Sequence, residues 1–232
     1  MATDAVSGLV VSEVFGPTLQ GEGPSAGRRA GFVRLGRCNL ACTWCDTAFT
    51  WDWSRYDPSV ELRRAGVAEV VAEVQAMDVP MVVITGGEPL LQQSGVAELA
   101  AALAPRRIEV ETAGTIAPRP ELVPLVHQWN VSPKLANSGN RRDRRYRPDA
   151  LRAFEATGRA VFKFVAAQPA DLDEAAAIVA ECGLTDVWVM PEGTSAEVLH
   201  ARMAALADAV VARGWSLTPR LHVELWGDKR GV

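Results

Sequence analysis

Three of the four cysteines lie close together in the sequence. They are Cys38, Cys42 and Cys45, in the segment Cys-Asn-Leu-Ala-Cys-Thr-Trp-Cys. Thiolates are soft ligands that favour iron–sulfur clusters or zinc. At this spacing they can bind three irons of one cubane cluster, which leaves the fourth iron open to a substrate or cofactor. The alternative is a structural zinc site completed by Cys182 or a histidine, although such sites more often contain two paired-cysteine units, and a second pair is missing.

A second segment with potential chemistry is Thr85-Gly86-Gly87-Glu88-Pro89, which follows an apolar run. Two glycines allow the backbone to approach a ligand closely. Carbonyl groups at the end of a strand can accept hydrogen bonds from an ammonium group. Alone, the segment could be a simple turn before a helix that begins with proline. Together with the three cysteines, it indicates a cofactor-binding loop.

Alternating strands and helices are expected to position these segments. Short apolar runs predict strands at 9–14, 32–35, 81–85, 108–111, 129–132, 161–165, 187–190 and 221–225. Helical patterns are found at 67–77, 96–103, 172–179 and 195–213. This alternation predicts an α/β fold with a parallel sheet and functional residues at the C-terminal ends of the strands. The stretches 38–57 and 133–148 show neither a strand nor a helix pattern. They are therefore expected to be long irregular loops, which are often functional.

Composition limits the class of protein. The chain has 232 residues, of which 48% are hydrophobic and 22% charged, so we expect one globular domain over residues 1–232. The formal net charge is -4, whereas proteins that bind nucleic acids usually have an excess of positive charge. No apolar run is long enough to span a bilayer, and residues 1–8 lack the pattern of a secretory signal. These observations predict a cytoplasmic protein with no membrane and no nucleic-acid partner.

The cysteine spacing resembles the signature of the radical S-adenosylmethionine (SAM) superfamily. Nearly the whole chain resembles one family within it, the 7-carboxy-7-deazaguanine synthases. The supporting segments are 13–23, which contains the pattern GPTxQGEG, and 32–34, 45–51, 111–112, 132–134 and 221–232. The resemblance implies an incomplete TIM-like barrel of about six core parallel strands, with the site at its C-terminal mouth.

The resemblance also implies an activity. Members of the family are carbon–nitrogen lyases that convert 6-carboxy-5,6,7,8-tetrahydropterin to 7-carboxy-7-deazaguanine with loss of ammonia, a step toward queuosine and other 7-deazapurines. The cofactors are a [4Fe–4S] cluster, SAM and Mg²⁺. One electron from the cluster cleaves SAM, the resulting radical abstracts hydrogen from the pterin, and SAM is re-formed. A homodimer and a reductant such as flavodoxin or ferredoxin are implied as partners.

The same resemblance assigns roles to individual residues. The cluster ligands are Cys38, Cys42 and Cys45, and the magnesium ligand is Thr47. The SAM site consists of Trp44, Asp46, Gly86, Gly87, Glu88, Glu111, Ser132, Pro133 and Lys134. The substrate contacts are Leu19, Gln20, Gly21, Glu22, Arg34, Thr85 and His222. Arg34 offers a planar fork to a substrate carboxylate, unless it forms only a surface ion pair.

Two other functions stay open. A glycyl-radical-enzyme activase shares the cysteine triad but acts on a protein, and the GPTxQGEG segment and residues 222–232 argue against it. A zinc-stabilised binding module would have no catalysis. Two features have no assigned role. We interpret Cys182 as a small buried hydrophobic residue, and the basic run Arg141–Arg147 as a solvated loop, with a mobile flap or a partner surface as alternatives.

Overall fold

The computed structural model describes residues 8–232. The prediction that residues 1–8 do not form a secretory signal therefore falls, apart from Gly8, outside the described residues. One sheet runs through the described chain in the order β3-β1-β2-β4-β5-β6-β7-β8-β9. Its strands are β1 (Leu9–Leu19), β2 (Arg29–Leu35), β3 (Arg63–Ala65), β4 (Met81–Gly86), β5 (Arg107–Thr112), β6 (Gln128–Val131), β7 (Ala160–Ala166), β8 (Val187–Pro191) and β9 (Ser216–Leu217).

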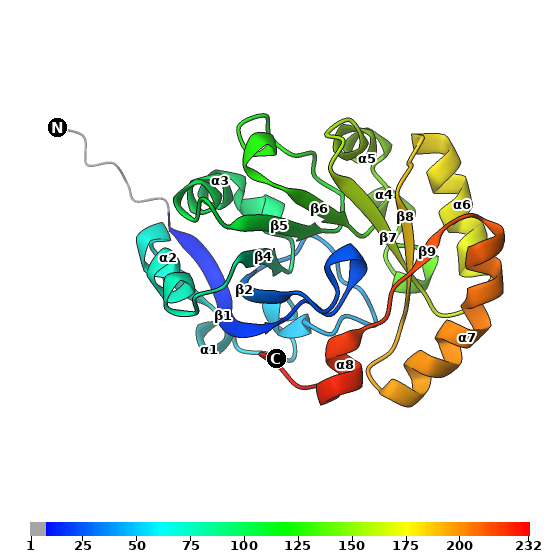
Figure 1. The fold of residues 1–232 in the computed structure, drawn as a ribbon, viewed down its shortest axis with the longest axis horizontal. Coiled ribbons are helices and arrows are strands. Elements are labelled where there is room, and N and C mark those ends of the chain that lie inside the picture. Colours follow the sequence, from blue (N-terminus) through cyan, green and yellow to red (C-terminus); the bar gives the residue numbers. More distant parts are fainter. Residues whose placement is uncertain (1–7) are drawn as a thin grey trace.

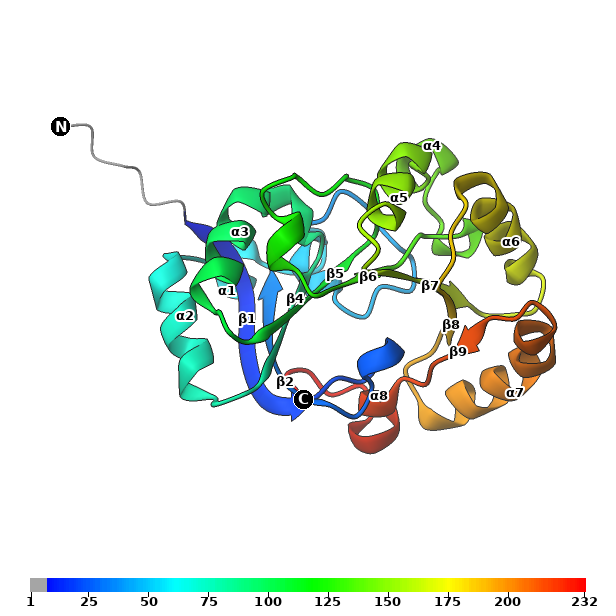
Figure 2. The same cartoon turned by 45° about the horizontal axis from the view of Figure 1, so that its top comes forward.

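The centre of the sheet is parallel. Strand β2 and strands β4 to β8 pair with one another in parallel, and the short β9 extends this set. Strand β1 pairs antiparallel with both β2 and β3. The prediction of six core parallel strands is therefore confirmed. The sheet curves but stays open, because its edge strands β3 and β9 do not pair, and α8 lies near the opening (Figure 2).

Helices cover the outer face of the curved sheet. The helices are α1 (Pro58–Glu61), α2 (Val67–Ala76), α3 (Gln93–Ala102), α4 (Arg142–Arg145), α5 (Pro148–Glu155), α6 (Asp171–Cys182), α7 (Ala196–Ala212) and α8 (Leu221–Trp226). Helices α2, α3, α5, α6 and α7 lie along the outside of the sheet (Figure 1). Within residues 8–232, no helix is long and apolar enough to cross a membrane.

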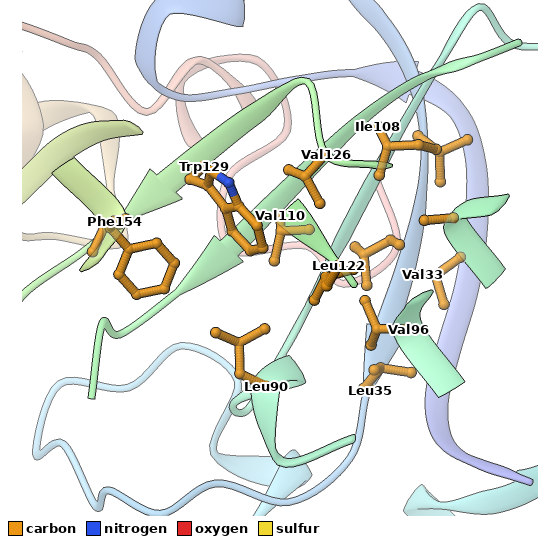
Figure 3. Packing of buried hydrophobic residues seen from close by; sticks show 14 of the residues in the cluster. Val33, Leu35, Leu90, Val96, Ile108, Val110, Leu122, Val126, Trp129 and Phe154 are labelled. Carbon is orange, nitrogen blue, oxygen red and sulfur yellow. The ribbon is translucent and has the colours of Figure 1, made fainter. Parts of the chain in front are cut away.

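The main core lies between the sheet and these outer helices. Figure 3 shows Trp129 of β6 beside Phe154 of α5, and their ring centroids are 5.3 Å apart in an edge-to-face arrangement. Strand β4 is buried along its apolar length, as parallel strands covered on both faces are. Cys182 belongs to this core and is 6% exposed, which agrees with its interpretation as a buried hydrophobic residue.

Capping residues explain where the longest helix begins and ends. The Ser195 side chain accepts a hydrogen bond from the Val198 amide, so α7 begins where the sequence predicts it. Gly214 follows the helix with a φ of 68°, in the left-handed region that favours glycine. The predicted helices at 67–77, 96–103 and 172–179 are also present, with small shifts at their ends.

One predicted strand is wrong. Residues 221–225 form helix α8 instead of a strand. Leu225 is 52% exposed, so this short apolar run does not correspond to a buried strand. The side chain of Arg220, which precedes the helix, is anchored in the interior, and the Leu221 amide donates to the Gly21 carbonyl at 2.9 Å. These contacts hold the segment without strand pairing.

The two irregular stretches are confirmed only in part. The first contains a 3₁₀ turn at Ala48–Thr50. The second contains a 3₁₀ turn at Ala136–Ser138 and the short helix α4. Both stretches follow C-terminal ends of parallel strands, namely β2 and β6. The fold therefore brings the cysteine loop and the arginine-rich loop to the same edge of the sheet.

Candidate functional site

The cysteine loop packs directly against the Gly-Gly loop that follows β4. The Gly87 amide donates to the Leu35 carbonyl at 3.0 Å, and the Glu88 amide donates to the Arg37 carbonyl at 2.8 Å. A Cβ atom on Gly86 would lie 2.1 Å from the Leu35 oxygen, and one on Gly87 would lie 2.1 Å from the Arg37 oxygen. The two glycines are therefore required by the contact between the two loops, in addition to any ligand they approach.

The three thiols of this loop line one cavity and each is partly exposed. Each sulfur accepts a hydrogen bond: Cys38 from the Leu40 amide at 3.4 Å, Cys42 from Asn140 Nδ2 at 3.2 Å, and Cys45 from Trp51 Nε1 at 3.3 Å. Such donors stabilise sulfur that carries negative charge. We refer to Cys38, Cys42 and Cys45 with these donors as the cysteine side of the cavity.

Burial raises the pKa of the Cys38 thiol to about 12 and also raises the pKa of Cys42. The neighbouring Cys42 and Cys45 side chains act on the Cys38 pKa in the same direction. A bound cation is then needed to hold Cys38 and Cys42 as thiolates. Within the described residues, no three His, Cys, Asp or Glu side chains are grouped around one metal position. A cubane cluster fits this arrangement better than zinc, because each thiolate binds a different iron.

The segment after β6 forms a wall next to the cysteines. Lys134 Nζ donates to the Ser132 carbonyl at 2.9 Å and to the Ser132 hydroxyl at 2.8 Å, and it lies 5.6 Å from the centre of the Trp44 ring. Trp44 Nε1 donates to the Asn137 carbonyl at 3.0 Å. Ser132, Lys134 and Trp44, which the family resemblance assigns to one cofactor site, thus line the same part of the cavity.

Glu111 connects residues that the sequence assigns to different ligands. It accepts a hydrogen bond from Gln20 Nε2 at 3.0 Å and another from the Thr85 hydroxyl at 2.8 Å. Gln20 and Thr85 are predicted substrate contacts, whereas Glu111 is a predicted SAM contact. All three line the cavity, so Glu111 lies where both ligands could be reached.

Opposite charges form a compact group around Glu22. Its carboxylate pairs with Lys163 and with Arg220 Nε at 3.2 Å, and His222 Nε2 lies 4.0 Å away. Arg220 also pairs with Asp46 and donates to the Gly193 carbonyl at 2.6 Å. We refer to Glu22, Lys163, Arg220 and His222 as the charged side of the cavity. The sequence links only Glu22, His222 and Asp46 to the site, and it misses Lys163 and Arg220.

Burial and the neighbouring charges together set the protonation states of Glu22 and His222. Burial would raise the pKa of Glu22, but Lys163 and then Arg220 outweigh burial and hold this pKa well below its usual range. Burial lowers the pKa of His222, against the opposing effect of Glu22. At neutral pH the site therefore contains an ionised carboxylate, two cations and a neutral imidazole. A Cβ on Gly21 would lie 2.0 Å from His222 Nδ1, so only glycine allows this ring position.

Arg34 lines the cavity but already has a partner. Its Nε donates to Glu13 Oε2 at 2.8 Å, and its guanidinium lies 5.5 Å from the centre of the Phe15 ring. Arg230 also pairs with Glu13 and lies 3.7 Å from the centre of the Phe49 ring. Glu13 thus holds both Arg34 and the C-terminal segment. The remaining guanidinium donors of Arg34 are available to a ligand.

The cavity collects most of the predicted site residues. It encloses about 220 Å³, the scale of a small molecule rather than of a folded protein. The predicted residues that line it are Leu19, Gln20, Gly21, Glu22, Arg34, Cys38, Cys42, Trp44, Cys45, Asp46, Thr47, Thr85, Gly86, Gly87, Glu111, Ser132, Lys134 and His222. Thr47 lies beside the cysteines, with its hydroxyl oxygen 3.6 Å from Cys45 Sγ.

Two predicted residues do not line the cavity. Pro133 is buried beside the wall formed by its neighbours. Glu88 is completely buried below the Gly-Gly loop, where it accepts hydrogen bonds from the Leu90 amide at 2.9 Å, the Ala113 amide at 2.8 Å and the Thr112 hydroxyl at 2.8 Å. Its observed contacts join the loops after β4 and β5.

Lys163 gives the only sequence signal that could have revealed the missing charges. It is a single cation inside the apolar run 161–165, and a buried charge normally requires a partner. Arg220 gives no comparable signal, because it lies in a polar segment after Pro219.

Comparisons with known proteins agree with this geometry. The Radical SAM superfamily profile matches residues 33–132. The chain is 41% identical to a 7-carboxy-7-deazaguanine synthase of Pyrobaculum aerophilum, over 95% of this chain and 96% of that protein. It is 30% identical to the 7-carboxy-7-deazaguanine synthase of Bacillus subtilis, over 97% of this chain and 99% of that protein. The solved structure of QueE from Escherichia coli superposes with a TM-score of 0.71 at 25% identity, covering 96% of this chain and all of that one.

Proposed function

Since the chain belongs to the 7-carboxy-7-deazaguanine synthase family, we propose that it converts 6-carboxy-5,6,7,8-tetrahydropterin to 7-carboxy-7-deazaguanine with loss of ammonia. The observation that carries this proposal is that three hydrogen-bonded thiols and an ionised carboxylate face one small cavity. The first group suits a cluster, and the second suits a polar heterocycle. A glycyl-radical activase would have to bind a polypeptide in this cavity. The small volume and the paired charges on the charged side do not favour such a substrate.

The cysteine side would hold the [4Fe–4S] cluster through Cys38, Cys42 and Cys45. When bound, the cluster and SAM supply the one-electron cleavage that starts the radical chemistry. For the chain itself, the hydrogen bonds from Leu40, Asn140 and Trp51 orient the sulfurs and stabilise their negative charge.

The SAM site would be formed by the surrounding loops. In this proposal Trp44, Asp46, Gly86, Gly87 and Glu111 contact SAM, together with Ser132 and Lys134 of the wall. Pro133, which is buried between them, would hold the two in place. Glu88 acts differently from the other residues assigned to this site. Because its carboxylate binds the Thr112 hydroxyl and two backbone amides, it would position the Gly-Gly loop without touching the cofactor.

The charged side would bind the pterin ring through hydrogen bonds. A pterin presents N–H donors beside a carbonyl acceptor, and an ionised carboxylate accepts two or more hydrogen bonds. Glu22 meets this requirement because Lys163 and Arg220 keep it ionised, while each of its oxygens retains a second lone pair. Leu19, Gln20, Gly21, Thr85 and His222 would complete the contacts with the ring.

Arg34 and Thr47 would bind the carboxylated end of the substrate and its metal ion. Arg34 is held by Glu13 and rests near Phe15, so its free donors have a fixed direction toward the cavity. Thr47 supplies a hydroxyl oxygen, a hard ligand of the kind that Mg²⁺ prefers, and the remaining positions would be filled by water or substrate oxygens.

The proposal extends to the setting in which the enzyme works. We propose one catalytic domain over residues 1–232, assembled as a homodimer and reduced by a carrier such as flavodoxin or ferredoxin. Four free cysteines and an iron–sulfur site suit a reducing compartment, which supports a cytoplasmic location. Light scattering of the purified protein tests the dimer.

Anaerobic turnover tests the function. The reconstituted protein is mixed with SAM, Mg²⁺, dithionite and the carboxytetrahydropterin, and products are quantified by mass spectrometry. We expect 7-carboxy-7-deazaguanine and ammonia in equal amounts. Cleavage of SAM without any conversion of the pterin would contradict the proposal.

A further inference from the structure

A second hollow opens on the surface beside the cysteine loop. It is bounded by Cys38 and Trp51 on one side and by Asn140, Arg141 and Arg144 on the other. Cys38 and Trp51 also line the main cavity, so the cysteine loop forms the wall between the interior site and this surface hollow. The cysteine loop can therefore be approached from solvent through a hollow that none of the charged-side residues lines.

The loop that carries the arginines is fixed to the cysteine loop. The Ala41 amide donates to Asn140 Oδ1 at 2.9 Å, and Asn140 Nδ2 donates to Cys42 Sγ at 3.2 Å. The Thr43 amide donates to the Ser138 carbonyl at 3.0 Å. On the other side, Arg145 Nε donates to the Asn140 carbonyl at 3.1 Å. The basic run is thus built into the environment of the cluster and is not a free flap.

The neighbouring side chains of this run point to solvent. Arg141 is 81% exposed, Arg142 is 66% exposed, and Arg144 is also exposed. We refer to these three residues as the arginine surface. Asp143 pairs with Arg141 at 2.8 Å and Glu181 lies 3.9 Å from Arg142, whereas Arg144 forms no salt bridge within the described part of the chain. The surface is positive on a chain whose net charge is -4.

We propose that the arginine surface docks an acidic protein that carries a low-potential one-electron centre, and that the hollow brings this centre close to the cluster. The proposal rests on the proposed function, which requires one electron to reach the cluster while the interior cavity holds the small molecules. Charge complementarity identifies the partner as acidic. It also explains why positive charge is concentrated at the loop that touches the cysteines.

The size of the surface suits a transient encounter. Electron-transfer complexes are among the smallest interfaces, and they depend on electrostatic steering more than on buried area. Binding that is steered by exposed charges weakens as salt increases. The three arginines, spread along one loop, provide steering without an extended apolar surface.

The test compares two charge-reversed pairs. Arg141→Glu/Arg144→Glu changes the arginine surface. Arg29→Glu/Arg159→Glu makes the same change in net charge with exposed residues at the start of β2 and just before β7, whereas the cysteine loop follows the C-terminal end of β2. Reduced flavodoxin is the probe, and the bleaching of cluster absorbance is followed by stopped flow. Calorimetry measures binding of flavodoxin separately.

We expect the first pair to slow reduction by flavodoxin by about tenfold or more at low salt, with weaker binding and a smaller salt dependence. The second pair should stay within about twofold of the parent. Both pairs should accept electrons from dithionite as the parent does. If Arg141→Glu/Arg144→Glu impairs cluster loading, Arg141→Gln/Arg144→Gln replaces it, with a smaller slowing in the same direction.

Equal rates of reduction by flavodoxin in the parent and the first pair would overturn the proposal, as would equal slowing by both pairs. Loss of binding to a single-stranded RNA probe without slower reduction would also overturn it and assign the surface to nucleic acid. Product formation with dithionite is a separate measurement. If the parent makes no product with dithionite while flavodoxin reduction depends on the arginines, the proposed function fails and the docking surface stands.

Discussion

The cysteine side and the charged side of the cavity differ in how their negative groups are stabilised. On the cysteine side, each sulfur accepts a hydrogen bond from an N–H donor, and burial keeps Cys38 and Cys42 protonated unless a cation is bound. On the charged side, Glu22 is already neutralised by Lys163 and Arg220, and both cations are buried. The first side depends on a group from outside the chain, whereas the second is complete without one. A substitution on one side should therefore impair the function of that side and leave the other side largely unchanged.

The largest expected effect is loss of the cluster. Replacing Cys38, Cys42 or Cys45 by Ala should abolish the visible absorbance, the acid-labile sulfide and the cleavage of SAM, because each iron corner requires its own thiolate. Pterin binding to the charged side should be weakened far less. Cys182→Ala is the control, since Cys182 lies in the core. Bleaching of the Cys182 variant would show that the ligand assignment is wrong.

Loss of Lys163 should damage the charged side alone. Lys163→Met leaves the largely buried Glu22 carboxylate with Arg220 and His222 as its remaining ion-pair partners. Breaking a buried ion pair costs up to about 3–5 kcal/mol of unfolding free energy. Urea denaturation under anaerobic conditions measures this change, while iron content should stay at the parent value. The double variant Lys163→Met/Glu22→Gln should recover part of the loss. A Lys163 variant that lost its cluster but kept its stability would contradict the separation of the two sides.

Arg34 should affect substrate binding and little else. Losing a guanidinium that faces a carboxylate typically costs about 2–5 kcal/mol, so Arg34→Ala should weaken pterin binding by that amount. Arg34→Lys should also bind poorly, because an ammonium cannot reproduce the planar fork. Cleavage of SAM without substrate should survive in both variants. Pterin titrations that match the parent would make Arg34 a purely structural partner of Glu13.

The smallest expected effect is a pH dependence from His222. Its folded pKa lies below its ordinary value, so the unfolded chain takes up this proton first. The contribution of neutral His222 to stability is therefore present above about pH 6.5 and is lost as the pH falls through the folded pKa, by at most about 1.4 kcal/mol per pH unit. His222→Gln should reduce the pH dependence of the unfolding free energy below about pH 6.5. An unchanged slope would mean that His222 titrates normally.

The cysteine side could be predicted from the sequence because its ligands are almost consecutive. The strand ends that position it follow from buried apolar runs such as 81–85. The charged side could be predicted only in part. Glu22 and His222 enter through the family resemblance, whereas Lys163 and Arg220 are joined to them by long-range folding. Nothing local at Arg220 reveals that it lies between Glu22 and Asp46.

The same limit explains the error at 221–225. A short apolar run is consistent with a buried strand, but here the buried Arg220 and the hydrogen bond from Leu221 to Gly21 fix the backbone as a helix. The burial of Glu88 behind the Gly-Gly loop could not be predicted, for a related reason. A motif shows which residues occur together, but not which of them faces the ligand and which supports the loop from behind.

The most direct test of the account is to change Glu22→Gln and measure the two sides in one anaerobic assay. We expect the variant to keep the cluster absorbance and the formation of 5′-deoxyadenosine from SAM in the absence of substrate, while pterin binding and 7-carboxy-7-deazaguanine formation fall sharply. Unchanged pterin affinity, combined with loss of substrate-free SAM cleavage, would contradict the assignment of Glu22 to the pterin and of the charged side to substrate recognition.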